Sequence, residues 1–538
     1  MRVLLVNWSN VWEGASRGGG VNGYLQGLAL ELARAGHDVC SLSGGWVYAP
    51  GSALQSGPGP CTIRRHADWH SVRCFEVINS PVVAPGIFQF DDPLGEVAAP
   101  DLECEITRFY HLLEPDIVHF HNIEGFSAGC VDAARTPSAT WPGAQVLFSL
   151  HNYHTICPQV YLMRGGRVAC TDSDNGHACA DCTRSPRDPG EERRIRASEY
   201  DKGVPDDAAR ETTEARAGLL GLSWGKIKRP IEVPLPGQPA ATREDVAVRG
   251  HAVPPPPVAL PVLNPSDPSW SPLENNAGAD PRNSRPMHPF GKRRRAMVEM
   301  LSRCSRVIAV SSFVHRKFEA MGVRREALRT LPIGTRMTEM AAASPELLFD
   351  PPPFEPPRPI RIVFLGYNNY YKGLPMLCDA LELLDRATLG RLHLHVFAKD
   401  IAAATPRLVR LESRLAALTT RGEYTPEQIP ALLSGKDLGL VPSVWWDNGP
   451  QTVLEFLACR LPVLGAALGG IPDMITHGEN GLLHCGNDRH DLATKLREVV
   501  ANPSILAMLR ANIKPPPTMG EHAAKMSELY AECVADGA

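Results

Sequence analysis

The sequence has no hydrophobic run long enough to span a membrane. A spanning helix needs roughly 18 or more consecutive apolar residues, and no run in the 538 residues approaches that length. The N-terminus, MRVLLVNWSN, lacks the longer apolar stretch and the cleavage site of a secretory signal. We therefore expect a cytoplasmic protein, with at most peripheral contact at the inner face of the plasma membrane, in which most of the 14 cysteines are reduced.

The sequence also lacks an excess of either charge. Lysine and arginine together number 55 and the acids 59, which gives a net charge of -4. Because a nearly neutral chain creates no general field that attracts polyanions, we expect no nucleic acid among its partners.

The chain is long enough for two large domains. At roughly 150 residues per domain, 538 residues with 43% hydrophobic content leave room for two domains and insertions. The first α/β unit has an apolar strand at residues 3–6, a turn containing Gly18, Gly19 and Gly20, and a helix with leucines at helical spacing. These glycines either let the backbone approach a ligand at the carboxyl end of the strand or form only a flexible turn. They do not form the GxGxxG fingerprint of a dinucleotide site.

Histidines follow two further predicted strands, at residues 116–122 and 145–154, and a third such strand lies at 305–313. An imidazole at the carboxyl end of a strand can reach a cleft and bind an anionic or sugar ligand. Each of these histidines could instead be a hydrogen-bonded structural residue. The four are His119, His121, His151 and His154.

The C-terminal half repeats the α/β pattern, and a proline-rich stretch at 336–358 indicates a hinge between the halves. The expected fold class is α/β, with two doubly wound, Rossmann-like domains that face each other across a cleft. The predicted domains are an N-terminal domain at 1–335 and a C-terminal domain at 359–515. The C-terminal strands are expected at 361–367, 392–398, 437–443 and 461–467.

Residues 183–295 have abundant proline and little hydrophobic periodicity. Such a segment cannot bury enough apolar surface to offset its ordering entropy, so we expect a long, poorly ordered insertion in the N-terminal domain. At its end, Gly291 to Arg295 read GKRRR, which indicates a solvated basic turn or, as the alternative, a contact with anionic lipid headgroups.

The stretch DNGPQTVLEF, residues 447–456, combines a helix start with a carboxylate in an apolar run. Pro450 suits the first helical position, with Asn448 or Gly449 as the cap. Free amides at a helix start bind phosphate, and here they would belong to Gln451, Thr452 and Val453. Because Glu455 has apolar neighbours on both sides, we expect it to enter a cleft and bind a polar partner such as a ribose diol.

Residues 442–483, which include this stretch, resemble the nucleotide-sugar signature of the GT4 glycosyltransferases of the GT-B fold. The resemblance implies that Glu455 holds the ribose and that Asp447 contacts the transferred sugar. The first of these acids is usually Glu in the family. The shorter Asp447 leaves the identity of the sugar open.

The resemblance extends to FLGYNNYYKGLPMLCDAL, residues 364–381, and implies that Lys372 with Gly373 contacts the diphosphate. Tyr367 stands where the family often has arginine, so Arg17 or Lys399 would assist Lys372. On the N-terminal side, the family implies that Gly18, Gly19, Gly20 and His121 belong to the acceptor and diphosphate loops and that His151 faces the reacting sugar. A C-terminal helix at 516–538 would return to the N-terminal domain.

The resemblance implies an enzyme of hexosyltransferase type. It would move a sugar from a nucleotide diphosphate sugar to a glycan or lipid-linked glycan with retention, in surface polysaccharide or lipopolysaccharide biosynthesis. No cofactor would be required, and the sequence has no Asp-x-Asp metal motif. Two alternatives stay open: a GT-B-fold nucleotide-sugar epimerase, and a non-catalytic nucleotide-sugar-binding protein. The donor base and the oligomeric state are not predicted.

Four cysteines lie close together in the sequence and end in a C-x2-C pair: Cys157, Cys170, Cys179 and Cys182. Four thiols at such spacing can hold a structural zinc. The irregular spacing favours free cysteines instead, and a disulfide is the least favoured reading.

Overall fold

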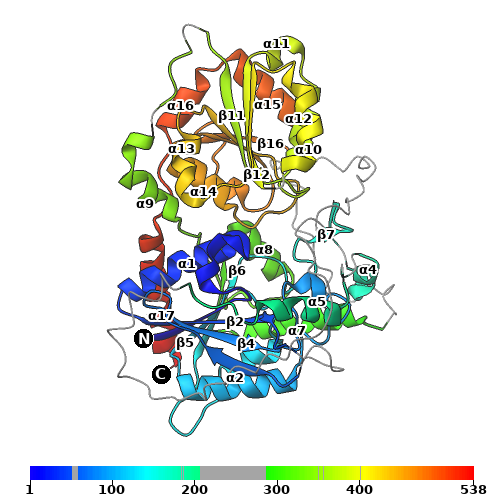
Figure 1. The fold of residues 1–538 in the computed structure, drawn as a ribbon, viewed down its shortest axis with the longest axis vertical. Coiled ribbons are helices and arrows are strands. Elements are labelled where there is room, and N and C mark those ends of the chain that lie inside the picture. The colour runs from blue at the N-terminus through cyan, green and yellow to red at the C-terminus, as the bar shows by residue number, and fades with distance from the viewer. Residues whose placement is uncertain are drawn as a thin grey trace, which may run out of the picture.

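The computed structural model describes residues 1–50, 59–171, 173–182, 185, 187–205, 286–348, 350–354, 357–399 and 401–537. Figure 1 shows two lobes, each built on a β-sheet with helices packed on both faces. Strands between residues 2 and 330 form the sheet of the N-terminal lobe, and strands between 360 and 484 form that of the C-terminal lobe.

The N-terminal sheet has eight strands, and all its pairings are parallel except that of β3 with β4. Its central strand β1 is buried between β2 and β5, which explains the continuous apolar run that predicted it. In spatial order the strands are β10 (Leu328–Thr330), β9 (Arg306–Ala309), β6 (Gln145–Leu150), β5 (Ile117–Phe120), β1 (Arg2–Val6), β2 (Asp38–Val47), β4 (Arg73–Ile78) and β3 (Thr62–Arg65).

The C-terminal sheet has six strands, all parallel. All four strands predicted in this half are present. In spatial order the strands are β13 (Ala417–Arg421), β12 (Leu392–Lys399), β11 (Ile360–Tyr367), β14 (Leu438–Val441), β15 (Val463–Ala466) and β16 (Gly481–His484). A separate two-stranded hairpin joins β7 (Met163–Arg164) to β8 (Val168–Ala169).

Helices cover both sheets. Those of the N-terminal lobe are α1 (Gly19–Arg34), α2 (Pro100–Leu113), α3 (Ala128–Ala133), α4 (His177–Ala180), α5 (Pro189–Arg196), α7 (Pro289–Arg303) and α8 (Ser312–Ala320). Those of the C-terminal lobe are α10 (Leu374–Glu382), α11 (Arg386–Leu389), α12 (Thr405–Glu412), α13 (Ile429–Leu433), α14 (Gln451–Ala458), α15 (Arg489–Ala501) and α16 (Ile505–Ala511). Short 3-10 turns include η1 (Val11–Ser16), η3 (Gly86–Gln89), η4 (Asp174–Gly176), η5 (Ala197–Glu199), η6 (Pro345–Leu347), η7 (Ile401–Ala403), η8 (Pro426–Gln428) and η9 (Ile471–Asp473).

Each sheet has one point where the chain reverses its winding. In the N-terminal sheet this point lies between β1 and β5, and in the C-terminal sheet it lies between β11 and β14. Open α/β sheets bind ligands outside the carboxyl ends of the strands at such a point. The loops that follow these four strands are therefore the first place to look for a site.

The chain passes between the lobes twice. It leaves the N-terminal lobe through α9 (Arg336–Ala343), and α17 (Met519–Gly537) returns and packs against α1 (Figure 1). The two passages meet where Thr335 pairs with Thr518 in an isolated parallel bridge. Among the described residues, no helix is both long and apolar enough to cross a membrane.

Helices occupy both ends of the range that we expected to be poorly ordered, since α5 begins at Pro189 and α7 begins at Pro289. Residues 206–285 of that range lie outside the described residues. The basic run is part of α7 rather than a solvated turn, and neither reading of it was right for Arg293, which is fully buried. Helical periodicity puts Arg293 on the same face as Met297 and Met300.

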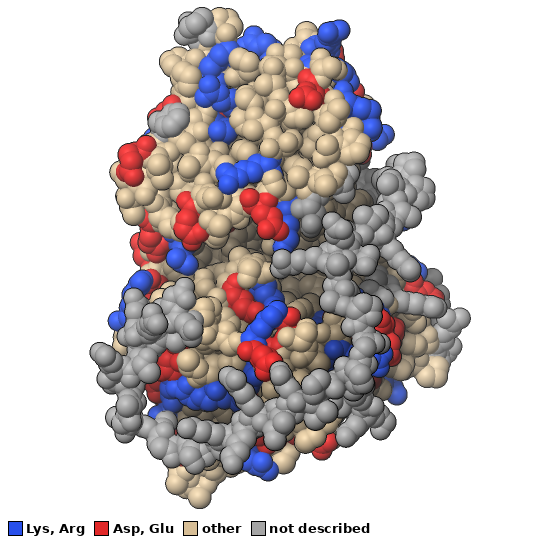
Figure 2. Space-filling model, viewed as in Figure 1, with Lys and Arg blue, Asp and Glu red and all other residues tan. Residues whose placement is uncertain are grey.

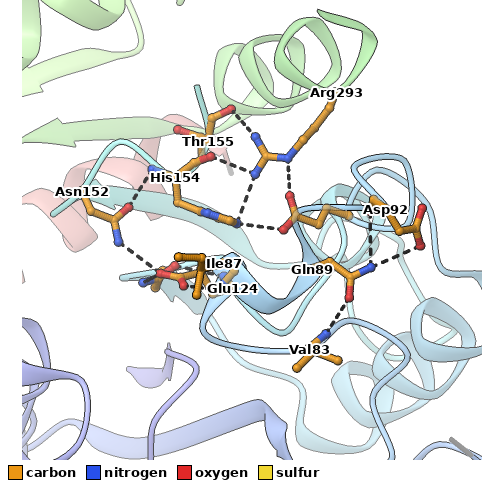
Figure 3. Close-up of polar contacts among 12 residues, drawn as sticks. Val83, Ile87, Gln89, Asp92, Glu124, Asn152, His154, Thr155 and Arg293 are labelled. Carbon is orange, nitrogen blue, oxygen red and sulfur yellow. Dashed lines mark hydrogen bonds and ion pairs between the residues drawn. The ribbon is translucent and has the colours of Figure 1, made fainter. Parts of the chain in front are cut away.

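Arg293 is buried together with a carboxylate and an imidazole (Figure 3). Its guanidinium pairs with Glu96 and donates to the carbonyl oxygens of His154 and Thr155 at 2.8 and 3.3 Å. The imidazole Nε2 of His154 lies 3.2 Å from the second carboxylate oxygen of Glu96. A buried charge is tolerated only with such partners. Among these contacts His154 is a structural residue, as the alternative reading of the strand-end histidines predicted.

Candidate functional site

The glycine turn after β1 lies against the C-terminal lobe. Gly18 has φ +82°, and a Cβ there would lie 2.5 Å from the hydroxyl of Ser9, so the position requires glycine. A Cβ on Gly19 would lie 4.0 Å from the hydroxyl of Tyr367. The carbonyl of Gly20 accepts a 2.6 Å hydrogen bond from the side-chain amide of Gln451. The turn therefore faces the start of α14 and the end of β11.

The loop between β11 and α10 carries Lys372 and Gly373. Gly373 has φ +78°, and a Cβ would lie 1.7 Å from the carbonyl oxygen of Pro442, so only glycine fits there. Lys372 donates from Nζ to Asp447 at 2.9 Å, and this carboxylate is buried. The two loops at the reversal point of the C-terminal sheet are thus held together by a charged pair.

Helix α14 begins one residue later than expected. Pro450 has ψ 123° and is the cap residue rather than the first helical residue. The amide of Val453 donates to the carbonyl of Pro450 at 3.0 Å, so its expected availability to phosphate is wrong. The backbone amides of Gln451 and Thr452 have no hydrogen-bond partner among the described residues. These two amides remain at the positive end of the helix dipole.

Glu455 is half-buried between Leu454 and Phe456, both of which are buried. Its carboxylate has no hydrogen-bond partner in the described part of the chain. Burial raises its pKa to about 7, and the charge of Lys372 opposes this shift. A carboxylate removed from water without a compensating partner is poised to accept hydrogen bonds from a ligand.

The loop before α14 also touches the strand end that carries His151. Asn448 donates to the carbonyl of Leu150 at 3.3 Å, and the Tyr153 hydroxyl donates to the carbonyl of Trp446 at 2.8 Å. Gly449 lies against Val310 of the N-terminal lobe. Figure 2 shows that the surface is indented between the two lobes. Acidic and basic side chains are interspersed on the visible face. Expected donor and acceptor residues therefore meet at one interdomain recess.

The strand-end histidines differ in exposure. His151 is half-buried, whereas His119 and His121 are at most 1% exposed. His121 Nδ1 lies 3.1 Å from Nε2 of His151. His119 bonds to Tyr530 and Ser149, so it is structural. His121, expected beside the acceptor, lies behind His151. The register of β5 and β6 pairs Phe120 with Phe148, so His151 lies two residues further toward the carboxyl edge of the sheet.

An aromatic contact across the lobes was not expected from the sequence. Tyr161 stacks on Tyr371 with ring centroids 4.1 Å apart and meets the edge of Trp445 at 4.9 Å. Nζ of Lys372 lies 6.0 Å from the ring centroid of Trp445. The Trp445-Trp446 pair beside Asp447 could have indicated an aromatic contact at this loop. The partner of Trp445, Tyr161, lies far away in the sequence and could not be identified.

The two residues named as helpers of Lys372 are engaged elsewhere. Arg17 pairs with Glu13 at 3.1 Å and Glu199 at 2.7 Å. Lys399 lies 3.6 Å from Glu423. Tyr367, which stands in place of the family arginine, is exposed beside the glycine turn.

The four clustered cysteines do not form a metal site. Within the described ranges, no group of three or more His, Cys, Asp or Glu side chains is placed to hold a metal ion. Two of the sulfur atoms accept hydrogen bonds from N–H groups. Gly165 donates to Cys182 at 3.1 Å, and Arg294 donates to Cys179 at 3.6 Å. The zinc reading is therefore not supported by these positions, and none of the 14 cysteines forms a disulfide. Cys157 is buried, and Cys170 follows β8.

The two facing doubly wound sheets and the site between them define the GT-B fold. HepE from Anabaena, solved in complex with UDP, superposes with a TM-score of 0.53 at 13% identity, covering 99% of this chain and 100% of that one. This likeness confirms the predicted fold class.

The C-terminal lobe also matches a family in sequence. Residues 359–502 match the family model "Glycosyl transferases group 1". This part of the chain is therefore similar to the group 1 glycosyltransferases, and the resemblance read from the sequence is confirmed.

Two curated relatives agree. A D-inositol 3-phosphate glycosyltransferase of Rhodococcus opacus is 31% identical over 163 residues, which is 29% of this chain and 36% of that protein. The colanic acid biosynthesis glycosyltransferase WcaL of Escherichia coli, a putative assignment, is 24% identical over 210 residues, or 37% of this chain and 48% of that protein. The chain thus spans less than half the length of these relatives.

Proposed function

We propose that this protein is a glycosyltransferase that moves a sugar from a nucleotide diphosphate sugar to a glycan or glycoconjugate acceptor with retention of configuration. The observation that carries the proposal is the position of Lys372. Its ammonium contacts Asp447, and its charge partly offsets the rise that burial causes in the pKa of Glu455. One cation, two carboxylates and two unbonded amides match the needs of a sugar, a diphosphate and a ribose.

Each group has a separate task in this proposal. The carboxylate of Glu455 accepts hydrogen bonds from the ribose diol. Lys372 and the amides of Gln451 and Thr452 bind the diphosphate and stabilise its charge as it leaves. Diphosphate binding requires Lys372 to exchange part of its contact with Asp447, and this frees the Asp447 carboxylate for a sugar hydroxyl.

The remaining expectations from the sequence complete the proposal. His151 contacts the reacting sugar from the N-terminal lobe, and the glycine turn at Gly18 to Gly20 gives the phosphates and the acceptor close access to backbone. The domains divide at 1–335 and 359–515, with 336–358 as the hinge and 516–538 as the returning helix. The reaction needs no metal in this scheme, because Lys372 and the helix amides provide the positive charge.

HepE was solved with UDP, and WcaL is named for colanic acid biosynthesis. These names support a nucleotide diphosphate sugar as donor and surface polysaccharide synthesis as the process. The proposal further includes a cytoplasmic location and lipopolysaccharide as a related acceptor class. A UDP sugar is therefore the first donor to test.

The test is a transfer assay with UDP, GDP and ADP sugars and a mixture of glycan acceptors. Transfer that needs an acceptor and gives a product with the donor's anomeric configuration, read by proton NMR coupling constants, supports the proposal. Conversion of the donor without acceptor indicates an epimerase instead. Nucleotide binding without turnover of any donor indicates the non-catalytic alternative.

A further inference from the structure

Behind His151 lies a buried cluster of imidazoles that the proposed chemistry does not use. His119 and His121 belong to the end of β5, and His522 lies in the first turn of α17. All three are at most 2% exposed. No carboxylate among the described residues is hydrogen-bonded to any of these rings or to His151. Within the described part of the chain, no carboxylate hydrogen-bonded to these rings therefore favours their charged form.

Two tyrosines fix the cluster in place. The hydroxyl of Tyr24 lies 2.7 Å from Nε2 of His522, and that of Tyr530 lies 2.7 Å from Nδ1 of His119. The ring of Tyr24 also packs on that of His151, with centroids 4.8 Å apart. His119 in turn lies 4.0 Å from His121, centroid to centroid. The orientation of each ring is thus constrained by its neighbours.

The rings are neutral at physiological pH. Burial, followed by repulsion from His522, lowers the pKa of His151 to about 3. Burial and the neighbouring imidazoles hold the pKa of His121 well below its usual value. Each neutral imidazole carries one proton, so only one of the two rings can donate across the 3.1 Å contact between His121 Nδ1 and His151 Nε2.

The two possible placements of the imidazole protons differ in free energy. If His151 donated from Nε2, neutral His121 would carry its proton on its own Nε2, which is buried without a partner among the described residues. If His121 donated from Nδ1, its Nε2 would be only an unoccupied lone pair. Orphaned buried N–H groups are rarer in proteins than unpaired acceptors, so the second assignment is favoured.

We infer that His121 is a positioning residue that donates from Nδ1 to Nε2 of His151 and thereby holds His151 in its Nδ1–H tautomer. This inference rests on the proposed function, which puts His151 at the reacting sugar. Nδ1 of His151 has no hydrogen-bond partner within the described residues. His151 thus presents an N–H donor, rather than a lone pair, to a substrate oxygen. The tautomer of a histidine is set by the hydrogen bond that its other nitrogen makes.

The first test is nitrogen-15 NMR of the full-length protein labelled at histidine. The signals of His151 are assigned by their loss in His151→Asn. In the unmutated protein we expect Nδ1 of His151 to be protonated and Nε2 to be bare. A His151 protonated at Nε2 would overturn the inference, and this measurement needs neither a substrate nor a variant of His121.

The second test is a matched pair of variants at His121. His121→Asn keeps an amide donor near the position of Nδ1, whereas His121→Phe keeps the volume of the ring and removes the donor. We expect the Nε2–H form of His151 to become populated only in His121→Phe. The rate kcat should fall at least about tenfold in His121→Phe and within about threefold in His121→Asn, because loss of a fixed tautomer impairs catalysis. The dissociation constant of the donor should change less than about twofold in both.

Equal loss of kcat in the two variants, or an unchanged tautomer in His121→Phe, contradicts the inference. A tautomer change with no change in kcat also contradicts it. If no nucleotide sugar is turned over by the unmutated protein but the tautomer follows the expected pattern, the proposed function fails while the assignment of His121 is supported.

Discussion

Two glutamates of this protein, Glu96 and Glu455, are both shielded from water, yet their pKa values are shifted in opposite directions. Burial alone would raise the pKa of Glu96, but Arg293 and His154 outweigh it and hold this pKa below its usual value. Burial raises the pKa of Glu455 to about 7, because Lys372 compensates only in part. Glu96 pairs with Arg293 and His154, whereas Glu455 has no such partner in the described part of the chain. Under the proposed function, the difference distinguishes a structural ion pair from a carboxylate that binds a ligand.

The largest expected effect comes from breaking the structural pair. Arg293→Met leaves Glu96 buried without its cation and should lower the free energy of unfolding by about 3–5 kcal/mol. The protein that remains folded should bind a UDP sugar with an unchanged dissociation constant. Denaturant unfolding and calorimetric titration measure the two quantities. Arg295→Met, at an exposed position of the same helix, is the control and should change neither. A large loss of donor affinity in folded Arg293→Met would contradict the separation of the two sites.

For Glu455 we expect the reverse, a loss of nucleotide affinity without a loss of stability. Glu455→Gln removes no internal hydrogen bond, so the free energy of unfolding should stay the same or rise slightly. Hydrogen bonds to a charged group are worth about 1.5–3 kcal/mol, so the dissociation constant for the nucleotide should increase about 10- to 150-fold. Equilibrium titration at pH 8 checks this, with Glu479→Gln at an exposed position as the control. Tight nucleotide binding by Glu455→Gln would show that the ribose lies elsewhere.

The two glutamates should also give opposite slopes of stability against pH. The pKa of Glu96 is lowered in the folded state, so its contribution is present above the unfolded pKa of about 4.5 and is lost as the pH falls. The pKa of Glu455 is raised to about 7, so the folded state binds its proton more tightly and stability decreases as the pH rises from about 4.5 to 7. Unfolding at a series of pH values should show that Glu455→Gln removes this decrease. If the variant follows the same curve as the unmutated protein between pH 5 and 8, the raised pKa is wrong.

The smallest expected effect is a shift in the pH dependence of nucleotide binding when Lys372 no longer acts on Glu455. Since Lys372 lowers the pKa of Glu455, Lys372→Met should move the midpoint of the pH dependence of nucleotide binding to a higher pH, in addition to weakening binding at every pH. Titrations between pH 6 and 9 give the midpoint directly. An unmoved midpoint would mean that Glu455 does not govern the pH dependence.

Much of the fold could be predicted because buried parallel strands are continuous apolar runs. The strand order, and with it the two reversal points beside the expected site, was not predicted, because it depends on tertiary pairing. Glu455 was singled out as a candidate because a carboxylate inside an apolar helix face conflicts with its surroundings. The start of α14 was missed by one residue, because Pro450 tolerates both the cap and the first helical position.

Other features depend on tertiary contacts that the sequence does not encode locally. A run of basic residues at Gly291 to Arg295 is typical of a solvated surface, and only the apolar residues at Met297 and Met300 hinted that Arg293 is buried. The contact between Tyr161 and Tyr371 joins the two lobes across about 200 positions of sequence, and no local pattern reports it. His121 and His151 follow two neighbouring strands, β5 and β6, and no local pattern tells which of the two is the more exposed.

Proton release on nucleotide binding tests the central claim most directly. Glu455 with a pKa of about 7 is about half protonated at pH 7, and a ribose-bound carboxylate is ionised. Calorimetric titration of a UDP sugar at pH 7, in buffers of different ionisation enthalpy, should therefore show release of about half a proton, and Glu455→Gln should show none. Equal binding by both proteins without proton release would place the donor site away from α14 and contradict the account.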